Sequence, residues 1–453
     1  MIEDRVTVEP ARGPLGGEVS VPGDKSVGHR AVIFNAAAEG EAIVSGLSSG
    51  RDICSTVGAM RSLGAELVDE GAGVLRIRGR GLAFDCPAGR LDCGNSGTTM
   101  RLLAGLLSGQ AFACELSGDD SLSGRPMGRV ADPLALMGAR VKTTAGHAPL
   151  RIDGRSLAGA KVDITVPSAQ LKTALLLAAL QARGRSKITE PALSRDHTER
   201  LLSGMGIEIG REIGGRRWSG ARIGKIGPLD GLPPGPSTVE IQGPAVPVAK
   251  DLHVHGDPSS AAFLAVAACI VPGSEITIRD LYINPTRSGF ARVLVRMGAD
   301  LRFSRTGESA GEAVGDLTVR GTGRLRGVEI GGEEMPATID EIPVLAVAAA
   351  CAEGTTLIRG AAELRVKESD RVAGITAMLG ALGARTEQGE DGLSILGGRL
   401  KGGALIETQG DHRMVMAAAI AALAAETGVQ VASAASVEVS FPGFFGLLEE
   451  LRG

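Results

Sequence analysis

Polar side chains recur at one kind of place in this chain, directly before segments rich in alanine and leucine. Ser, Asn and Asp at such positions are ordinary helix N-caps. A helix N-terminus also presents free N–H groups and positive potential, which suit phosphate and carboxylate groups. The positions are Lys25-Ser26, Asn95-Ser96-Gly97-Thr98, Ser168-Ala169-Gln170, Asp257 to Ser260, Asp340-Glu341 and Asp411-His412-Arg413.

Arginine recurs at a second kind of place, the loop that follows each predicted strand. Taken singly, such arginines are usually solvated or form surface ion pairs. If both kinds of place lie at related ends of a repeated unit, guanidinium groups and free N–H groups converge. The sequence therefore predicts a site for a small polyanion. The arginine positions are Arg51, Arg125, Arg195, Arg287 and the segment from Arg365 to Arg371.

Other kinds of site have weaker support. His253 and His255 could bind a metal ion, but the sequence suggests no third ligand nearby, and one face of a strand is the simpler interpretation. The chain has neither a G-x-x-x-x-G-K-[ST] loop nor a strand–GxGxxG–helix unit. No Ser-His-Asp or Cys-His spacing indicates a hydrolase.

Six segments rich in Ala and Leu, each ending at a glycine, would have to position these side chains. Ala and Leu favour helix, and a terminal glycine suits the C′ position. Most of the segments are apolar nearly all round, which predicts helices buried on every side. They are 29–40, 100–109, 171–184, 261–273, 342–354 and 413–428.

A second motif, an apolar residue followed by Gly and usually Ala, is expected to close an amphipathic helix. It occurs at 63–65, 137–139, 205–207, 297–299 and 382–384. The two motifs together predict six units of strand, helix, strand, helix and strand, arranged as two similar halves. The Pro- and Gly-rich stretch 228–247 is a natural place for a domain boundary.

Composition and charge exclude several classes of function. The 453 residues include 2% aromatics and carry a net charge of −4, which argues against a nucleic-acid binder that stacks bases. The six cysteines form no C-x-x-C pair, so free thiols in a reducing compartment are expected. The N-terminus resembles no signal peptide, and the apolar segments are too short to span a membrane. We expect a soluble, cytoplasmic protein.

Six motifs together give the chain a specific resemblance. They occur in the same order as in the 5-enolpyruvylshikimate-3-phosphate synthase family, and they span nearly the whole sequence. The chain therefore resembles that family, and a divergent bacterial subgroup of it. The motifs are Pro22 to Ser26 with His29-Arg30, Asn95 to Thr98 with Arg101, Gly124 to Met127, Ser168 to Gln170, Arg365 to Arg371, and Asp411 to Met414.

The resemblance implies an α/β fold, a two-domain inside-out α/β barrel. Each domain would contain three βαβαββ units around buried parallel helices. In the family the chain crosses between domains twice, so the N-terminal strand belongs with the C-terminal half. The N-terminal domain is therefore expected at residues 23–254, and the C-terminal domain at residues 1–22 plus 255–453.

The resemblance also implies a reaction. Family members transfer the enolpyruvyl group of phosphoenolpyruvate to the 5-hydroxyl of shikimate 3-phosphate and release phosphate, through a tetrahedral intermediate in the cleft between domains. The reaction belongs to the shikimate pathway, toward chorismate and the aromatic amino acids, and glyphosate occupies its phosphoenolpyruvate site. No metal and no cofactor are expected, and the partners would be the two small anions, with no nucleic acid and no membrane. We expect a monomer.

Site residues follow from the positions that match the family's motifs. The catalytic residues would be Asp340 as acceptor of the 5-hydroxyl proton, Glu368 near the enol methylene, and Lys25. The shikimate 3-phosphate ligands would be Lys25, Ser26, Arg30, Ser168, Ala169, Gln170, Arg195, Asp340 and Lys367. The phosphoenolpyruvate ligands would be Lys25, Gly97, Arg125, Gln170, Arg371 and Arg413.

The chain departs from the family's pattern at several of these places. Many members have a Lys shortly before the C-terminal Phe-Pro, where this chain has Val439-Ser440, so one phosphoenolpyruvate contact is absent or replaced. Ala169 stands where many members have a second Ser. Arg195 lies in a stretch that usually contains Ser and Tyr, and could supply the missing phosphate contact. Glyphosate-tolerant members of the subgroup have Ala at the position of Gly97.

Two other interpretations remain open from the sequence. The UDP-N-acetylglucosamine enolpyruvyl transferases share the fold and chemistry, but they typically carry a reactive Cys before their Arg-Pro pair, and segment 121–126 has none. A non-catalytic anion-binding module is a different class. Asp340 and Glu368 argue against it, because binding alone would favour fewer acids beside anions.

Overall fold

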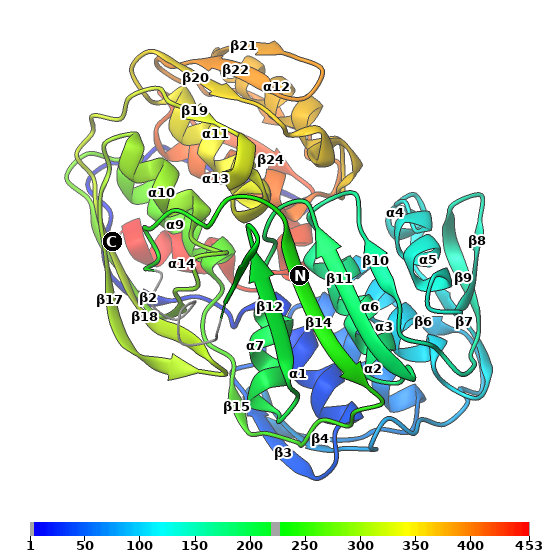
Figure 1. The fold of residues 1–453 in the computed structure, drawn as a ribbon. Helices are drawn as coiled ribbons and strands as arrows, with labels where there is room; N and C mark the ends of the chain where they lie inside the picture. Colours follow the sequence, from blue (N-terminus) through cyan, green and yellow to red (C-terminus); the bar gives the residue numbers. More distant parts are fainter. Residues whose placement is uncertain (1–3, 219–226, 453) are drawn as a thin grey trace.

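The computed structural model describes residues 4–218 and 227–452. Its described residues form a mixed α/β protein of two domains, with six sheets of three to five strands each (Figure 1). Three sheets lie in the lobe that contains most of the first half of the chain. The other three lie in the lobe that contains the second half. The six repeats expected from the glycine spacing therefore correspond to six sheets.

The second sheet illustrates the repeated unit. Its elements are β6 (Leu91–Asp92), α3 (Gly97–Ser108), β7 (Ala113–Ser117), α5 (Gly128–Ala135), β8 (Arg140–Thr144) and β9 (His147–Asp153), with the short α4 (Asp120–Ser123) inserted. β6 runs parallel to β7, and β9 lies antiparallel between β7 and β8. The unit expected from the residues alone therefore lacked its last strand.

The other sheets repeat this order with variations, and three of them include a strand from a distant part of the chain, namely β15, β2 and β1. The first and third sheets contain β3 (Glu41–Ser45), β4 (Glu66–Gly71), β5 (Val74–Arg78) and β15 (Leu252–His253), then β10 (Lys161–Asp163), β11 (Gly184–Glu190), β12 (Ile209–Ile213), β13 (Arg216–Arg217) and β14 (Ser237–Gly243). The last three contain β2 (Gly16–Ser20), β16 (Glu275–Tyr282), β17 (Asp300–Ser309) and β18 (Glu312–Arg320), then β19 (Glu329–Ile330), β20 (Thr355–Ile358), β21 (Arg385–Gln388) and β22 (Leu393–Leu396), then β1 (Arg5–Val8), β23 (Leu405–Ile406) and β24 (Val429–Ala432).

Each of the six Ala- and Leu-rich segments forms a helix, as expected. Every residue of α3, α9, α11 and α13 is buried, because these helices have no polar face to present to water. α3 packs against α6, and α11 packs against α9 and α13. The other five helices of this inner set are α1 (Lys25–Ala37), α6 (Ala169–Ala179), α9 (Pro258–Ile270), α11 (Ile342–Ala350) and α13 (His412–Leu423).

Most of the inner helices end before the glycine that was expected at their C′ position. Most of the outer helices, which form the second helix of each unit, do have a glycine at C′. α1 ends at Ala37, three residues before Gly40, whose φ of +102° starts the turn into β3. By contrast, α2 is followed at C′ by Gly64 with a φ of +79°. The outer helices are α2 (Arg51–Ser62), α5, α7 (His197–Gly204), α10 (Gly289–Arg296), α12 (Arg371–Ala381) and the C-terminal α14 (Phe444–Arg452).

The N-terminal strands pair with the second half of the chain. β2 runs parallel to β16, and β1 runs antiparallel to β24. The two passages between the halves lie side by side, where the N–H of Asp24 donates to the carbonyl of His255 at 2.7 Å. The boundary suggested by the Pro- and Gly-rich stretch 228–247 is wrong, because β14 within it lies between β11 and β12. Among the described helices, none has the length and apolar content to cross a membrane.

Candidate active site between the two halves

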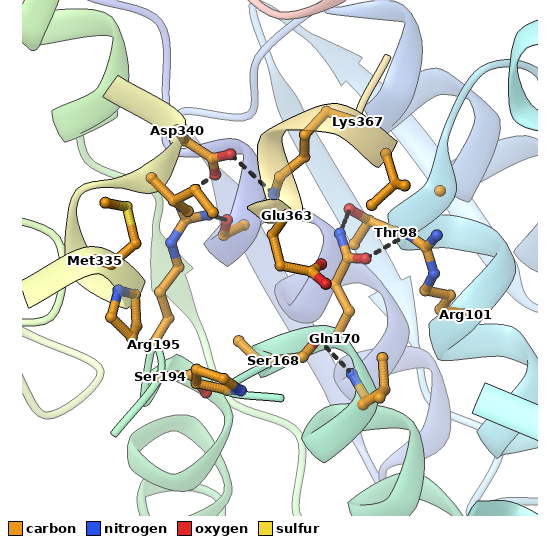
Figure 2. A pocket seen from close by; sticks show the side chains of 18 of the residues that line it. Thr98, Arg101, Ser168, Gln170, Ser194, Arg195, Met335, Asp340, Glu363 and Lys367 are labelled. Atoms are coloured by element: carbon orange, nitrogen blue, oxygen red, sulfur yellow. Dashed lines mark hydrogen bonds and ion pairs between the residues drawn. The ribbon is translucent and has the colours of Figure 1, made fainter. Parts of the chain in front are cut away.

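A cavity of about 400 Å³ lies between the two halves, and both halves contribute to its lining. Figure 2 shows Thr98, Arg101 and Gln170 on one side of it, facing Asp340 and Lys367 on the other. The side chain of Arg195 extends across the cavity to Asp340. The convergence expected from the two recurring kinds of place is therefore present for Arg125, Arg195 and Arg287, whereas Arg51 does not line the cavity.

Helix N-termini surround this cavity. A Ser or Asp side chain caps five of the six inner helices, as the residue types predict, whereas the entry to α11 at Asp340-Glu341 has no side-chain cap. Residues beside these entries line the cavity. Ser96, for example, accepts from the N–H of Thr99, and Gly97 and Thr98 face the cavity. The same arrangement places the N-termini of α1, α6, α9 and α13 at the cavity, capped by Asp24, Ser168, Asp257 and Asp411.

The ionisable lining of the cavity is mainly positive. Eight cationic and five acidic side chains line it, which leaves a surplus of three positive charges. Together with the helix N-termini, this surplus favours a ligand with several negative charges. The cations are Lys25, Arg101, Arg125, Arg129, Arg195, Arg287, Lys367 and Arg413, and the acids are Asp52, Asp257, Asp340, Glu363 and Glu368.

Asp340 lies at the centre of the cationic side chains. Its carboxylate is 2.5 Å from Nη2 of Arg195 and 3.3 Å from Nζ of Lys367. Guanidinium groups of Arg371 and Arg413 follow at 3.6 and 3.9 Å. Burial would raise the pKa of this carboxyl group, but these cations, Lys367 foremost, hold the pKa well below its usual range. Asp340 is therefore ionised at neutral pH.

Glu368 occupies a similar environment. Its carboxylate is 2.5 Å from Nη2 of Arg371 and 3.4 Å from Nη1 of Arg125, which comes from the other half of the chain. Burial would raise its pKa, but Arg371 and then Arg125 hold the pKa well below the usual range. The arrangement therefore favours the ionised form of Glu368.

The comparisons with known proteins agree with these features. The family model for EPSP synthase (3-phosphoshikimate 1-carboxyvinyltransferase) matches residues 10–219 and 233–448. The chain belongs to the EPSP synthase family. The resemblance noted from the six motifs is thereby confirmed.

Relatives of known name support the membership. A 3-phosphoshikimate 1-carboxyvinyltransferase from Synechococcus is 47% identical, over 99% of this chain and 97% of that protein. The same-named protein of Halorhodospira halophila is 47% identical, over 97% and 94%. The solved EPSP synthase of Acinetobacter baumannii has a TM-score of 0.83 and 37% identity, over 99% and 98% of the two chains. The enolpyruvyl transferase NikO of Streptomyces tendae, at 18% identity and a TM-score of 0.75, shares the fold.

Most positions carried over from the EPSP synthase family line the cavity. Arg125 also hydrogen-bonds Asn95 at 2.6 Å, and Arg413 donates to the backbone carbonyl of Asp340 at 2.9 Å. The remaining ones in the lining are Lys25, Ser26, Gly97, Ser168, Ala169, Gln170, Arg195, Lys367 and Glu368.

Two positions carried over from the EPSP synthase family do not line the cavity. The guanidinium of Arg30 is buried, and its N–H groups donate to Thr198, Thr173 and the carbonyl of Ser26. Arg371 is fully buried. Neighbouring protein groups accept N–H groups of both arginines, and the substrate contacts expected for these two residues stay predictions.

Sequence reasoning missed one ion pair in the lining. Arg129 and Glu363, from opposite halves, pair at 2.8 Å where they line the cavity. The only available signals were the four-residue spacing of Arg129 from Arg125 and the closeness of Glu363 to the charged segment 365–371. Neither signal connects two residues 234 positions apart.

The sequence singled out Arg287 and Arg101 but assigned neither of them a role in the site. Arg287, one of the recurring loop arginines, is buried and donates to Oγ of Ser26 at 3.1 Å. Arg101, part of a matching motif, donates to Oε1 of Gln170 at 2.7 Å. Both arginines therefore hold predicted ligand residues in place.

His253 and His255 lie away from this cavity, at the passage between the halves. The sequence suggested no third ligand near them. The structure corrects this point, because the carboxylate of Asp280 lies 2.7 Å from Nδ1 of His255 and 3.4 Å from Nε2 of His253.

Proposed function

We propose that this chain transfers the enolpyruvyl group of phosphoenolpyruvate to the 5-hydroxyl of shikimate 3-phosphate and releases phosphate, in the shikimate pathway. The observation that carries the proposal is the position of Asp340, whose carboxylate lies between Arg195 and Lys367 in a cavity with surplus positive charge. Both substrates are small anions with phosphate and carboxylate groups, which such a lining can bind.

The two substrates would occupy different parts of the lining. Shikimate 3-phosphate would lie against Ser26, Arg195 and Lys367, because two cations and a hydroxyl group there suit its phosphate. Phosphoenolpyruvate would lie beside Gly97 and between Arg125 and Arg413. Further contacts to shikimate 3-phosphate would come from Lys25, Ser168, Ala169, Gln170 and Asp340, and Lys25 and Gln170 would also contact phosphoenolpyruvate.

Asp340 would act as the base of the addition step. An ionised carboxylate can accept the proton of the 5-hydroxyl as that oxygen bonds to C2 of phosphoenolpyruvate. C3 gains a proton in the same step, which gives a tetrahedral intermediate with a methyl group. In the elimination, the bond from C2 to the phosphate oxygen breaks, and the methyl group loses a proton to restore the double bond.

Lys25 would donate the proton that C3 gains, and Glu368 would accept the proton that C3 loses in the elimination. Lys25 carries an ammonium group 2.9 Å from Asp52 and faces the cavity, so it can supply a proton. Glu368, ionised, can accept one during the elimination. His412, a neighbour of Glu368, is a poor donor, because burial, and then Lys25, lower its pKa to about 3.

Arg30 and Arg371 would act through other residues. Arg30 braces the carbonyl of Ser26 and the hydroxyl group of Thr173, at the starts of α1 and α6. Arg371 binds Glu368 and Asp411, at the start of α13. They would position the two faces of the cavity and leave substrate contact to other cations.

The finer architecture proposed is an inside-out barrel, with domains at 23–254 and at 1–22 plus 255–453. Two observations support it. The buried apolar residues form two large clusters, and one of them consists almost entirely of residues 27–254. The other joins residues 8–21 to residues 261–451.

A cytoplasmic monomer is also proposed. All six cysteines are free thiols, which suits a reducing compartment.

The test is phosphate release on mixing the purified chain with phosphoenolpyruvate and a second substrate. Shikimate 3-phosphate should give release, and each substrate alone should not. Release with UDP-N-acetylglucosamine instead would assign the chain to the sister reaction. Tight binding of both anions without release would make it a binding module.

A further inference from the structure

Three potential metal ligands meet at the passage between the two halves. His253 ends β15, His255 follows it, and Asp280 lies in β16 of the other half. Each can offer one ligand atom, and these atoms lie within 4.8 Å of one another. The cluster is outside the cavity described above and takes no part in the proposed reaction.

The surroundings hold each of the three side chains in place. Nδ1 of His253 hydrogen-bonds Oγ of Ser45 at 2.9 Å, which turns Nε2 toward Asp280. The ring of Tyr282 packs edge-on against His255, with centroids 5.2 Å apart. A polar partner on the second ring nitrogen is the usual way in which proteins orient a metal-binding histidine.

The backbone at Asp280 is constrained as well. Asp280 has a φ of +58°, within the irregular part of β16 between Ile278 and Leu281. Its N–H donates to Asp316 at 2.9 Å, and its carbonyl accepts from the N–H of Gly256 at 2.8 Å. A non-glycine residue held at positive φ is uncommon, and the conformation directs this carboxylate toward both histidines.

We propose that His253, His255 and Asp280 bind a divalent transition-metal ion, with zinc as the best match. Two imidazoles and one carboxylate are a known zinc ligand set that leaves one position for water. In a tetrahedral zinc site, ligand atoms lie about 3.4 Å apart. Nε2 of His253 lies 3.4 Å from Oδ2 of Asp280, which fits this value, whereas Nδ1 of His255 lies 2.7 Å from Oδ1 and would move outward on metal binding. The three ligand atoms lie within 4.8 Å of one another, so the side chains would shift slightly to reach one ion.

The charges around the cluster favour a cation. The ion pairs of Asp280 within the described residues are with the two histidines. The neighbouring Arg279 pairs with Glu18 and Asp316 instead. Asp280 therefore lacks a permanent positive partner, and a metal ion supplies one.

Metal bound here joins the two halves of the chain. β15 pairs with β3 in the first sheet, whereas β16 pairs with β2 and β18 in the fourth. One ion would link these two sheets beside both passages of the chain.

The test is competition for zinc between the metal-free protein and a chromophoric chelator. The wild type should take up one equivalent per chain. Asp280→Asn should weaken binding at least tenfold, and it should fold normally because Asn tolerates positive φ. Ser45→Ala removes only the orienting partner and should weaken binding about 10- to 100-fold.

Two controls separate this cluster from other groups. Asp300→Asn removes an exposed carboxylate elsewhere on the same sheet, and Cys54→Ser with Cys86→Ser removes the exposed thiols. Both should bind zinc as the wild type does, and cobalt bound to the wild type should show no thiolate charge-transfer band. Failure of the wild type to compete, or equal affinity in Asp280→Asn, would overturn the proposal.

Discussion

Oδ2 of Asp340 lies 2.5 Å from Nη2 of Arg195, and the two residues come from opposite halves of the chain. The contact keeps Asp340 ionised and also occupies the guanidinium group proposed to bind the substrate phosphate. Binding of shikimate 3-phosphate must therefore draw Arg195 partly away from Asp340. The carboxylate of Asp340 would thus lose its contact with Arg195, and become free to act as a base, when shikimate 3-phosphate binds.

The role of Asp340 predicts a loss of turnover in Asp340→Asn. The amide keeps the size of the side chain but cannot accept the 5-hydroxyl proton, so kcat should fall by about 10²–10⁴. The KM for shikimate 3-phosphate should stay the same or fall, because Arg195 and Lys367 lose a competing anion. Glu363→Gln is the control, since it removes a carboxylate of the cavity lining that touches Arg129. Near-normal kcat in Asp340→Asn would refute the assignment.

Arg125 and Arg413, the cationic clamp proposed to hold phosphoenolpyruvate between them, predict weaker substrate binding in Arg125→Ala. The change leaves a substrate oxyanion without its charged donor, which should cost about 2–5 kcal/mol in kcat/KM for phosphoenolpyruvate. Arg413→Ala should behave alike. Arg151→Ala is the matched control, because Arg151 is 71% exposed and pairs with Glu115 on the surface. Steady-state kinetics decide, and an unchanged kcat/KM in both clamp variants would contradict the proposed site.

The position of Gly97 predicts a change in inhibition. A Cβ there would lie 2.8 Å from Nη1 of Arg101 and 3.3 Å from Nη1 of Arg125, so the added methyl group narrows the phosphoenolpyruvate site. Gly97→Ala should raise the inhibition constant of glyphosate more than the KM for phosphoenolpyruvate, because glyphosate is slightly longer. One methyl group discriminates by about 1–3 kcal/mol.

The control for this prediction is Gly58→Ala, on α2, where an added Cβ meets nothing within 4 Å. Both constants should stay at their wild-type values in that variant. Equal fold-changes of the two constants in Gly97→Ala would show that the methyl group does not distinguish the ligands.

Asp411 predicts a pH-dependent stability. It contacts the buried Arg371 at 2.8 Å, and Arg371 holds its pKa below the ordinary value of 3.8 although burial alone would raise it. Asp411→Asn leaves that arginine short of a partner, which should lower the free energy of unfolding by about 3 kcal/mol at pH 7.

The sign of the pH effect follows from the depressed pKa. The contribution of Asp411 is complete above the unfolded pKa of about 3.8 and disappears as pH falls through the lower folded pKa. The stability difference between wild type and Asp411→Asn should therefore be constant from pH 7 to 5 and shrink below pH 4. Denaturant unfolding measures it. Asp370→Asn, a cap of α12 whose side chain is 40% exposed, should cost about 1 kcal/mol or less.

Local sequence patterns predicted the buried helices and their caps, because helix propensity, burial of apolar side chains and N-capping act over short stretches of chain. Ala- and Leu-rich segments such as 261–273 can only be buried helices, and the capping role of Ser96 follows from its residue type. The cavity at the helix entries followed from repetition of these patterns. The repeat deduced from the residues alone missed the last strand of the unit, such as β9, although the resemblance to the family implied it and β9 follows β8 closely in the chain.

The sequence did not reveal contacts between residues that are distant in the chain. Arg371 and Arg413 were both predicted to bind phosphoenolpyruvate, and only the structure shows that Arg413 lines the cavity while Arg371 is buried against Asp411. Asp280 is 25 residues from His255 and carries no motif. Only the folded passage between the halves brings these two side chains together.

The pairing of β1 with β24 has a consequence during synthesis on the ribosome. Arg5 is matched with Ala432, so β1 emerges more than 400 residues before its partner strand exists. At roughly 5–20 residues per second, this interval is about 20–80 seconds. During this interval the strands of residues 41–243 are synthesised while β1 still has no partner strand. The sheet of β1, β24 and β23 can therefore form only after β24 has been made.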